Sequence, residues 1–502
     1  MKYAPLIFIV GLACSNVADK VENQGLQIHS SHQQIEKTFQ WAGEKARTYV
    51  QTGKQGPVDV WERGEGTDTV AYIPSYWAGY PGRSAFYSRD FCHQALGAHL
   101  LGLEEENFTM LRAFAASADE GKKWYPLWAI NFDGSPFKLD YRHDSSFVRE
   151  VPATFELVET TYRLYSWTGD NRYITDSVIW NFCTKAVTDF ITLHDQHLPN
   201  GVAEGTGKGI FAGAASYNEQ RDLPLIEAGD GIASQYAAMN AYAKMLDARG
   251  EQSNWAYQRA ASLKDYFNGS WSKGFANQLT RGYLADGTPA GGWGKENSWF
   301  MIMKNIATSG ERTDQYIQYV DDRLTSKEDI PDNIEALSYI PETFFNNHEN
   351  ELGWKWMQHI MTRLDQTHAY EEATGQNGDY PEVSYVLVQN IVNDLMGIKP
   401  NAASGTIHSL SHLPEAVDAL TVVNIPFGNN LISLQHVGTN QSTLSNHGDQ
   451  PVKWYPAFLG EDKVLSTDNA GLKTKSGHDR GVAYTYTEVS IAPGGSVTVI
   501  AE

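Results

Sequence analysis

The sequence has few cysteines, few basic residues for its number of acids, and no long hydrophobic run. Its 502 residues include three cysteines, and because no CxxC or HExxH spacing occurs, the sequence does not support a zinc site. We assign no metal-ligating residue and expect no cofactor. The 39 basic residues against 60 acidic ones give a formal net charge of −21. This charge argues against nucleic acid and a bare anionic membrane as partners. No run of about 20 apolar residues could span a bilayer.

Residues 1–14 resemble a bacterial secretion signal. Lys2 precedes an apolar run from Ala4 to Ala13, and the sequence Gly-Leu-Ala before Cys14 resembles a loose lipobox. We therefore expect cleavage before Cys14 and acylation of that residue. The mature protein would then be a periplasmic or outer-membrane lipoprotein tethered through Cys14, with simple secretion as the alternative.

The other two cysteines, Cys92 and Cys183, each lie in a predicted buried helix. Two inert thiols in the core are the expected state. A disulfide formed in an oxidising compartment is the alternative.

Helical periodicity covers most of the chain. The segment from Phe91 to Gly102 contains no charged residue and is followed at once by an acidic helix start at Glu104, which predicts a buried helix turning into an exposed one. The same plan repeats along the chain and predicts twelve helices: 34–50, two within 87–110, 151–168, 172–194, 232–246, 254–271, 296–303, 314–324, 333–345, 351–364 and 377–396. Alternation of less charged and more charged helices predicts an (α/α)6 barrel. The helix at 333–345 fits worst, because it carries Glu335, Pro341 and Glu342.

From about Leu413 the pattern changes to an alternation of period two bounded by turn residues. Strands are predicted at 419–425, 431–434, 482–486 and 496–500. We therefore expect a mainly α protein with a catalytic barrel at 15–412 and a small antiparallel β-sandwich at 413–502.

Polar clusters precede the predicted inner helices, whose amino termini gather at one mouth of such a barrel. The clusters are Arg89-Asp90, 140–150, 219–222, Lys295-Glu296 and 379–382. Acids also favour helix amino termini as caps, so a structural role is the alternative for each one. Together they predict an active site.

Hydrolysis of a glycosidic bond needs a proton donor and a second carboxylate. We favour Glu296 as the donor, because burial at the start of an apolar helix would raise its pKa, and Asp90 as the partner, expected to stay ionised beside Arg89. Further catalytic candidates are Glu219, Asp144 and Glu150. The candidates for substrate binding are Arg89, Trp77, Tyr80, Arg142, His143, Arg149, Tyr217, Arg221, Trp293, Lys295 and Glu382. The arginines would hold a carboxylate-bearing sugar, unless each pairs with its neighbouring acid.

The twelve-helix alternation, the Trp167-Thr-Gly-Asp170 turn and the ending Leu395-Met-Gly-Ile-Lys-Pro400 resemble the six-hairpin glycosidase superfamily. This resemblance implies a secreted or lipoprotein enzyme of bacterial polysaccharide breakdown, acting on an oligosaccharide or polysaccharide. The usual α-L-rhamnosidases of the superfamily carry additional β-domains before the barrel. We therefore expect an exo-acting hydrolase that releases a uronic acid, similar to β-glucuronidases or unsaturated glucuronyl hydrolases.

Three alternatives remain open: an α-L-rhamnosidase, a polysaccharide lyase on the same barrel, and a glycan-binding lipoprotein without activity. A lyase would use Tyr217, Tyr87 or His143 to abstract the proton alpha to a uronate carboxylate, while Arg142 neutralises that carboxylate. The sequence does not define the oligomeric state or the stereochemical course of the reaction. It also leaves open a loop supported by calcium, because its Asp and Asn residues never reach an EF-hand spacing.

Overall fold

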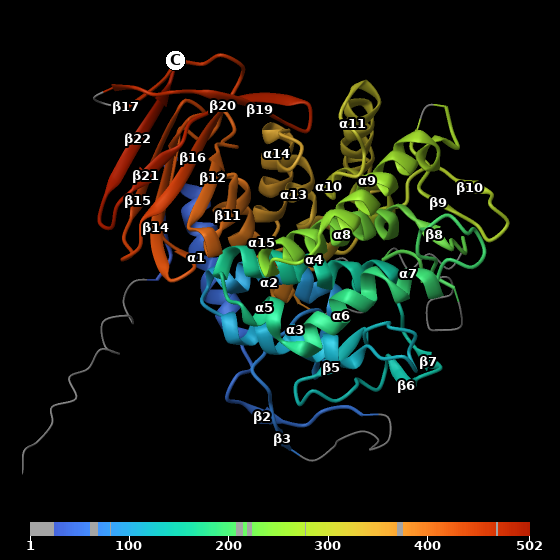
Figure 1. Cartoon of the computed structure of the whole chain (residues 1–502). Coiled ribbons are helices and arrows are strands. Elements are labelled where there is room, and N and C mark those ends of the chain that lie inside the picture. The colour runs from blue at the N-terminus through green and yellow to red at the C-terminus, as the bar shows by residue number, and fades with distance from the viewer. Residues whose placement is uncertain are drawn as a thin grey trace, which may run out of the picture.

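The structure is a computed structural model that describes residues 25–60, 69–80, 82–206, 214–217, 223–276, 278–368, 375–467 and 470–502. Helices make up one part of the molecule, and the C-terminal strands form sheets on one side of them (Figure 1). The predicted order, helices first and strands after them, is confirmed. No described helix combines the length and the apolar character needed to cross a membrane.

One set of helices is buried on nearly every side. In α2 (Ser88–Leu100) every residue except Arg89 is buried. The other members of the set are α4 (Val151–Thr168), α8 (Gly229–Arg249), α10 (Glu296–Met303), the pair α12 (Ile334–Ser338) and α13 (Ile340–Phe345), and α15 (Pro381–Gln389). Each contacts the next in this order, and α15 contacts α2. The contacts among these inner helices therefore run in a closed cycle.

The remaining helices alternate with the inner ones along the chain and cover them. They are α1 (Gln33–Thr48), α3 (Glu104–Ser117), α5 (Arg172–Thr175), α6 (Ser177–Val187), α7 (Asp189–Leu193), α9 (Asn254–Gly269), α11 (Glu311–Thr325) and α14 (Asn350–Met361). In α11 the buried stripe includes Tyr316, Val320 and Leu324, whereas the other face is charged. This one-sided burial is typical of an outer layer.

Two predicted helices are interrupted. Asp176 divides the helix predicted at 172–194, because its carboxylate accepts hydrogen bonds from the backbone N–H groups of Val178 and Ile179 and so begins a new helix. A further break at Thr188 separates α6 from α7. The helix predicted at 333–345 divides at Tyr339, and Pro341 occupies the first turn of the second segment, where proline is tolerated.

The β-region contains two sheets with buried residues in a common core. One sheet has the strand order β1-β13-β14-β15-β22-β17-β18, and the other has β11-β12-β16-β20-β19 with β21 beside β16. Their bounds are β1 Gln27–Ser30, β11 Ile398–Asn401, β12 Thr406–Leu410, β13 Ala419–Phe427, β14 Asn430–Val437, β15 Gln441–Asn446, β16 Val452–Leu459, β17 Leu465–Thr467, β18 Ala470–Gly471, β19 Lys475–Asp479, β20 Val482–Tyr486, β21 Val489–Ile491 and β22 Ser496–Ala501. The four predicted strands correspond to β13, β14, β20 and β22.

Three strands of these sheets come from outside residues 413–502. Strands β11 and β12 precede that segment, and β1 pairs antiparallel with β13, with Ile28 opposite Val422. No helix or strand was predicted from the sequence for residues 27–30. A strand forms there because the exposed edge of β13 offers backbone partners.

Short paired strands lead into the inner helices and fix where these begin. Strand β4 (Ala85–Tyr87) pairs with β5 (Ala129–Asn131) and runs directly into α2. Strand β8 (Glu227–Ala228), paired with β9 (Gly282–Tyr283), runs into α8. The other short strands are β2 (Gln55–Gly56), β3 (Val70–Ala71), β6 (Tyr141–His143), β7 (Ser146–Phe147) and β10 (Pro289–Ala290).

Gly97 allows α2 and α15 to pack closely. A Cβ atom at this position would clash with the backbone carbonyl group of Tyr385, so we expect Gly97→Ala to lower the free energy of unfolding by about 1–3 kcal/mol through overpacking. Gly269→Ala is the matched control, because a Cβ there meets nothing within 4 Å. Denaturant unfolding of both variants tests this, and equal stability of the two would contradict it.

The cysteine prediction is confirmed for the two residues that the structure describes. Cys92 and Cys183 are free thiols, both buried. Cys14 lies outside the described residues, so the lipid tether stays a prediction.

Candidate active site

Every inner helical segment carries a buried acid at its amino-terminal end. These acids are Asp90 in α2, Glu150 before α4, Asp230 in α8, Glu296 in α10, Glu335 in α12 and Glu382 in α15. None of them is more than 6% exposed. Helix amino termini favour negative charge, but six buried acids at one end of a ring of helices exceed what capping requires. This end of the ring is the candidate active site.

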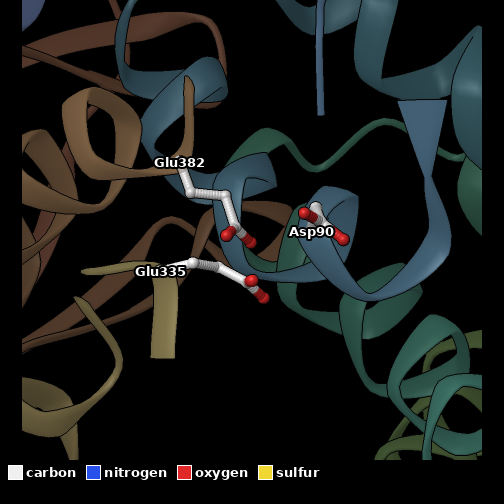
Figure 2. A group of neighbouring side chains, drawn as sticks. All are labelled: Asp90, Glu335 and Glu382. Atoms are coloured by element: carbon white, nitrogen blue, oxygen red, sulfur yellow. The ribbon is translucent and has the colours of Figure 1, made fainter. Parts of the chain in front are cut away.

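Three of these acids form a compact cluster, named here the acid triad: Asp90, Glu335 and Glu382. One carboxylate oxygen from each lies within 4.8 Å of the other two, and the three side chains point toward one another from separate elements (Figure 2). Arg89 Nη2 lies 2.9 Å from Glu335 Oε1. The ion pair with Arg89 therefore singles out Glu335 as the member of the triad that carries negative charge.

Tyr339 connects two members of the acid triad. Its hydroxyl oxygen lies 2.9 Å from Glu335 Oε1 and 2.5 Å from Glu382 Oε1. A neutral hydroxyl has one proton to donate, and burial raises the pKa of Tyr339 well above its usual value. One of the two short contacts therefore needs a proton from a carboxyl group.

That proton belongs on Glu382. Burial, followed by the charges of Asp90 and Glu335, raises the pKa of Glu382 well above its usual value. The hydrogen bonds then run in one direction: the Glu382 carboxyl donates to Tyr339, and the Tyr339 hydroxyl donates to the Glu335 carboxylate. Asn333 Nδ2 also donates to Glu335, over 2.8 Å.

Burial also raises the pKa of Asp90, Asp230 and Glu296. Burial and the charge of Glu335 raise the pKa of Asp90 to about 7. Burial raises the pKa of Asp230 to about 7 as well, although Ser216 and the Tyr217 backbone N–H donate to it. Burial also raises the pKa of Glu296, in the direction that the sequence predicted.

The raised pKa of Asp90 predicts a pH-dependent effect on stability. In the unfolded chain this aspartate loses its proton near pH 4, whereas the folded protein keeps it until about pH 7. Its stabilising contribution is therefore complete below pH 4 and is lost as the pH rises through 7. Asn cannot ionise, so Asp90→Asn should gain thermal stability relative to the parent protein between pH 5 and 7.5. A Tm difference that stays constant over this range would contradict the prediction.

Several residues predicted from the sequence meet at this end of the ring. Asp90, Glu150, Glu296 and Glu382 are among the six buried acids. Glu150 also accepts a hydrogen bond from Trp128 Nε1 over 2.8 Å. Predicted binding residues Arg89 and Tyr217 lie beside them: Arg89 pairs with Glu335, its guanidinium stands 5.1 Å from the Tyr217 ring centre, and it donates to the Tyr217 carbonyl.

The structure places other predicted residues elsewhere. Asp144 lies on the β6–β7 hairpin with 54% of its side chain exposed and Lys122 3.5 Å away. Arg142 and His143 are exposed on the same hairpin, because its strands of three and two residues do not bury alternate side chains. Glu219 and Arg221 lie outside the described residues.

Most of the aromatic and basic residues predicted to bind substrate are instead engaged in contacts within the protein. Trp77 donates from Nε1 to the Arg83 carbonyl, and Trp293 donates to the Asp329 carbonyl. Arg83 covers the ring of Tyr80 at 4.7 Å. Arg149 stacks on Tyr125 and Phe147.

Lys295 immediately precedes Glu296 and adopts a left-handed backbone conformation, with φ of 51°. Its positive charge acts to lower the pKa of Glu296, against the larger effect of burial. It therefore remains a candidate for contact with substrate.

Sequence reasoning did not select Glu335, Asp230 or Tyr339 as site residues. The helix at 333–345 fitted the predicted barrel worst, in part because it carries the charged residue Glu335. An acid at the start of a predicted inner helix was nevertheless the feature that could have identified Glu335 as a site residue. Asp230 stands one residue before the charge-free run that begins at Gly231 and was not counted with it.

Among the described residues, the acid triad is the group of acids close enough together to hold a metal ion. Calcium takes about six to eight oxygen ligands. Here Glu335 pairs with a guanidinium at 2.9 Å, and the Tyr339 hydroxyl bonds both Glu335 and Glu382. Arg89 is therefore the cation that the protein itself provides next to this group.

Comparisons with known proteins find structural likeness only. Neither the known protein families nor the curated proteins include a match to this sequence. The GH78 family rhamnosidase of Bacillus sp. GL1 aligns with a TM-score of 0.58 and 13% identity, over 84% of this chain and 40% of the rhamnosidase. The α-L-rhamnosidase of Streptomyces avermitilis, solved with L-rhamnose, aligns with a TM-score of 0.57 and 9% identity, over 95% of this chain and 42% of its own.

The α-L-rhamnosidase of Aspergillus terreus gives a TM-score of 0.56 and 12% identity, over 93% of this chain and 50% of its own. This chain thus spans 40–50% of the length of these three solved structures. These rhamnosidases have an (α/α)6 barrel. The likeness shows that the chain shares their fold, and it leaves the uronic-acid specificity expected from the sequence unestablished.

Proposed function

We propose that the protein is an exo-acting glycoside hydrolase built on an (α/α)6 barrel, with its active site at the acid triad. The carrying observation is the set of six buried acids at the amino-terminal ends of the inner helices, in which Glu335 pairs with Arg89 while burial raises the pKa of Glu382 and of Asp90. The closed cycle of contacts among the inner helices supports the barrel. Glycosidic cleavage needs one carboxylic acid that donates a proton and one ionised carboxylate that activates water or attacks the sugar carbon.

In this proposal Glu335 is the carboxylate that activates water or attacks the sugar carbon. Arg89, Tyr339 and Asn333 hold it in place and keep it charged. Asp90 and Glu296 are the candidates for the proton donor to the leaving oxygen, because burial raises the pKa of both. A pKa of about 7 for Asp90 suits proton donation near neutral pH.

A neutral terminal sugar such as rhamnose fits this site best. The acid triad is crowded with carboxyl groups, and Arg89, which the sequence assigned to a sugar carboxylate, is already paired with Glu335. An additional carboxylate from a uronic acid would be repelled there. The fold shared with rhamnosidases agrees with this choice.

Release of a uronic acid is the second candidate. Lys295 stands beside Glu296 and places a positive charge at this end of the ring. An ammonium in that position could hold a sugar carboxylate.

The test is a substrate screen with matched aryl glycosides, an α-L-rhamnoside and a β-D-glucuronide, followed by oligosaccharides that end in each sugar. Hydrolysis of either class supports the glycosidase, and the preferred sugar decides between the two candidates. A new ultraviolet chromophore from polyuronate would instead identify a lyase. Binding without new reducing ends would identify a glycan-binding protein.

Tyr339→Phe is expected to alter the pH dependence of catalysis. Loss of the hydroxyl removes a hydrogen bond that stabilises the charged form of the Glu335 carboxylate. The acidic limb of the kcat/KM profile should therefore move to higher pH. Tyr385→Phe is the control, because its hydroxyl donates to the Ala46 carbonyl. Superimposable profiles for Tyr339→Phe and the parent enzyme would exclude this role.

A further inference from the structure

A cavity of about 740 Å³ lies at the opposite end of the inner helices. Its wall includes Arg163 near the end of α4, Lys304 directly after α10 and Glu342 in α13, and His408 of β12 closes it from the β-region. Glu150 stands at the start of α4, and Arg163 follows it by thirteen residues, or about 20 Å at 1.5 Å per residue. This cavity, named here the distal cavity, is therefore separate from the acid triad.

Ion pairs and hydrogen bonds hold the polar side chains of the distal cavity in place. Lys304 Nζ contacts Glu156 at 2.5 Å and Glu159 at 2.6 Å. Arg163 lies 3.4 Å from Glu342, which also accepts a hydrogen bond from Gln389. These partners fix the geometry of the wall, as in a preformed ligand site.

Two acids give the distal cavity both hydrogen-bond donors and acceptors. Burial, with the charge of Glu342 added, raises the pKa of Asp394 to about 7. Burial also opposes ionisation of Glu342, but Arg163 and Lys304 outweigh it and lower the pKa of that residue. At neutral pH the cavity thus offers a carboxylate beside a partly protonated acid.

The wall also carries aromatic rings beside polar groups. Tyr162 and Tyr236 border the cavity, and Lys244 Nζ lies 5.2 Å from the centre of the Tyr162 ring. Asn240 and Asn346 add amide groups. A sugar ring uses this combination, because its C–H face packs on aromatic rings while its hydroxyls donate and accept.

Other ligand classes fit the wall less well. A phosphate group would need several cations without acids beside them, whereas two cations of the wall, Lys304 and Arg163, are each paired with a carboxylate. An aliphatic ligand would need a wall without buried ions. The volume of the distal cavity falls within the roughly 300–1,000 Å³ range of small-molecule sites.

We propose that the distal cavity is a second saccharide-binding site, which holds an oligosaccharide end away from the acid triad. The choice of a saccharide over other polyols rests on the proposed glycosidase function. The site itself rests on the distal cavity and on its residues.

Calorimetric titration of the full-length Glu335→Gln variant tests the proposal without turnover of the probe. The probes are a rhamnose-terminated and a glucuronate-terminated disaccharide, with inorganic phosphate as the anion control. Ala237→Trp should fill the distal cavity, because Ala237 is a half-buried residue of its wall, and it removes no polar partner. Ala116→Trp, at an exposed position of α3, is the matched control.

We expect binding of at least one disaccharide that Ala237→Trp weakens tenfold or more and that Ala116→Trp leaves unchanged. Lys244→Ala, a change at an exposed residue, should weaken the same binding and guards against misfolding of the tryptophan variant. Disaccharide binding that neither cavity variant affects, no binding at all, or displacement by phosphate would overturn the proposal. Failure of the proposed catalytic function and failure of the proposed binding site are distinguishable. The substrate screen can fail while the distal cavity still binds a disaccharide, and the screen can succeed while the cavity binds none.

Discussion

Glu335→Gln is expected to lower kcat by about a thousandfold while the protein remains folded. Glutamine keeps the shape of the side chain but cannot accept a proton or attack carbon. Glu335 is the acid that Arg89, Tyr339 and Asn333 all contact, so the effect should exceed that of changing any other member of the acid triad. Steady-state kinetics on the substrate identified by the screen measure it.

The matched control for this variant is Glu311→Gln. Glu311 is an exposed acid at the start of the outer helix α11, so it shares the helix position of Glu335 but not its surroundings. Full activity of Glu311→Gln with loss in Glu335→Gln would support the assignment. Glu335→Gln with parental kcat would remove Glu335 from the mechanism.

Arg89→Leu is expected to lower the free energy of unfolding by about 3–5 kcal/mol near pH 7.5. The Arg89 side chain is 12% exposed and lies 2.9 Å from Glu335, which is 3% exposed. Removing the guanidinium leaves a buried carboxylate without its charged partner. Protonation relieves such a charge, so the loss should become smaller as the pH falls toward 5. Denaturant unfolding at several pH values measures both effects.

Arg112→Leu provides the comparison for Arg89→Leu. Arg112 pairs with Asp176 at 3.0 Å, but its side chain is 46% exposed, and exposed ion pairs contribute about 0–1 kcal/mol. A loss for Arg89→Leu as small as for Arg112→Leu, or one independent of pH, would contradict burial of charge as the cause.

The sequence predicted the order of the helices and four of the acids at the amino-terminal ends of the inner helices, because both depend on local sequence pattern. Charge-free runs such as the one after Asp90 mark buried helices, and an acid at the start of such a run is then placed at their amino-terminal ends. This pattern marks Asp90, Glu296 and Glu382, whereas Glu150 stands in a polar cluster before the predicted helix at 151–168. Each is now seen to be almost completely buried.

The sequence did not predict the pairing of these side chains. Arg89 and Asp90 are neighbours in the chain, which suggested that Asp90 would stay ionised beside it. Consecutive residues on a helix point about 100° apart, and Arg89 instead reaches Glu335 on α12. The ionised partner of Arg89 is therefore a residue distant in sequence, and burial raises the pKa of Asp90 to about 7.

The pairing of β1 with β13 has a consequence for how the chain is made. Ile28 pairs with Val422, so a strand that emerges early from the ribosome waits for its partner until most of the chain has been synthesised. During that time its backbone groups are open to other partners. Contacts between such distant segments also form slowly. We therefore expect docking of β1 to be a late step in folding, completed only after the helices have assembled.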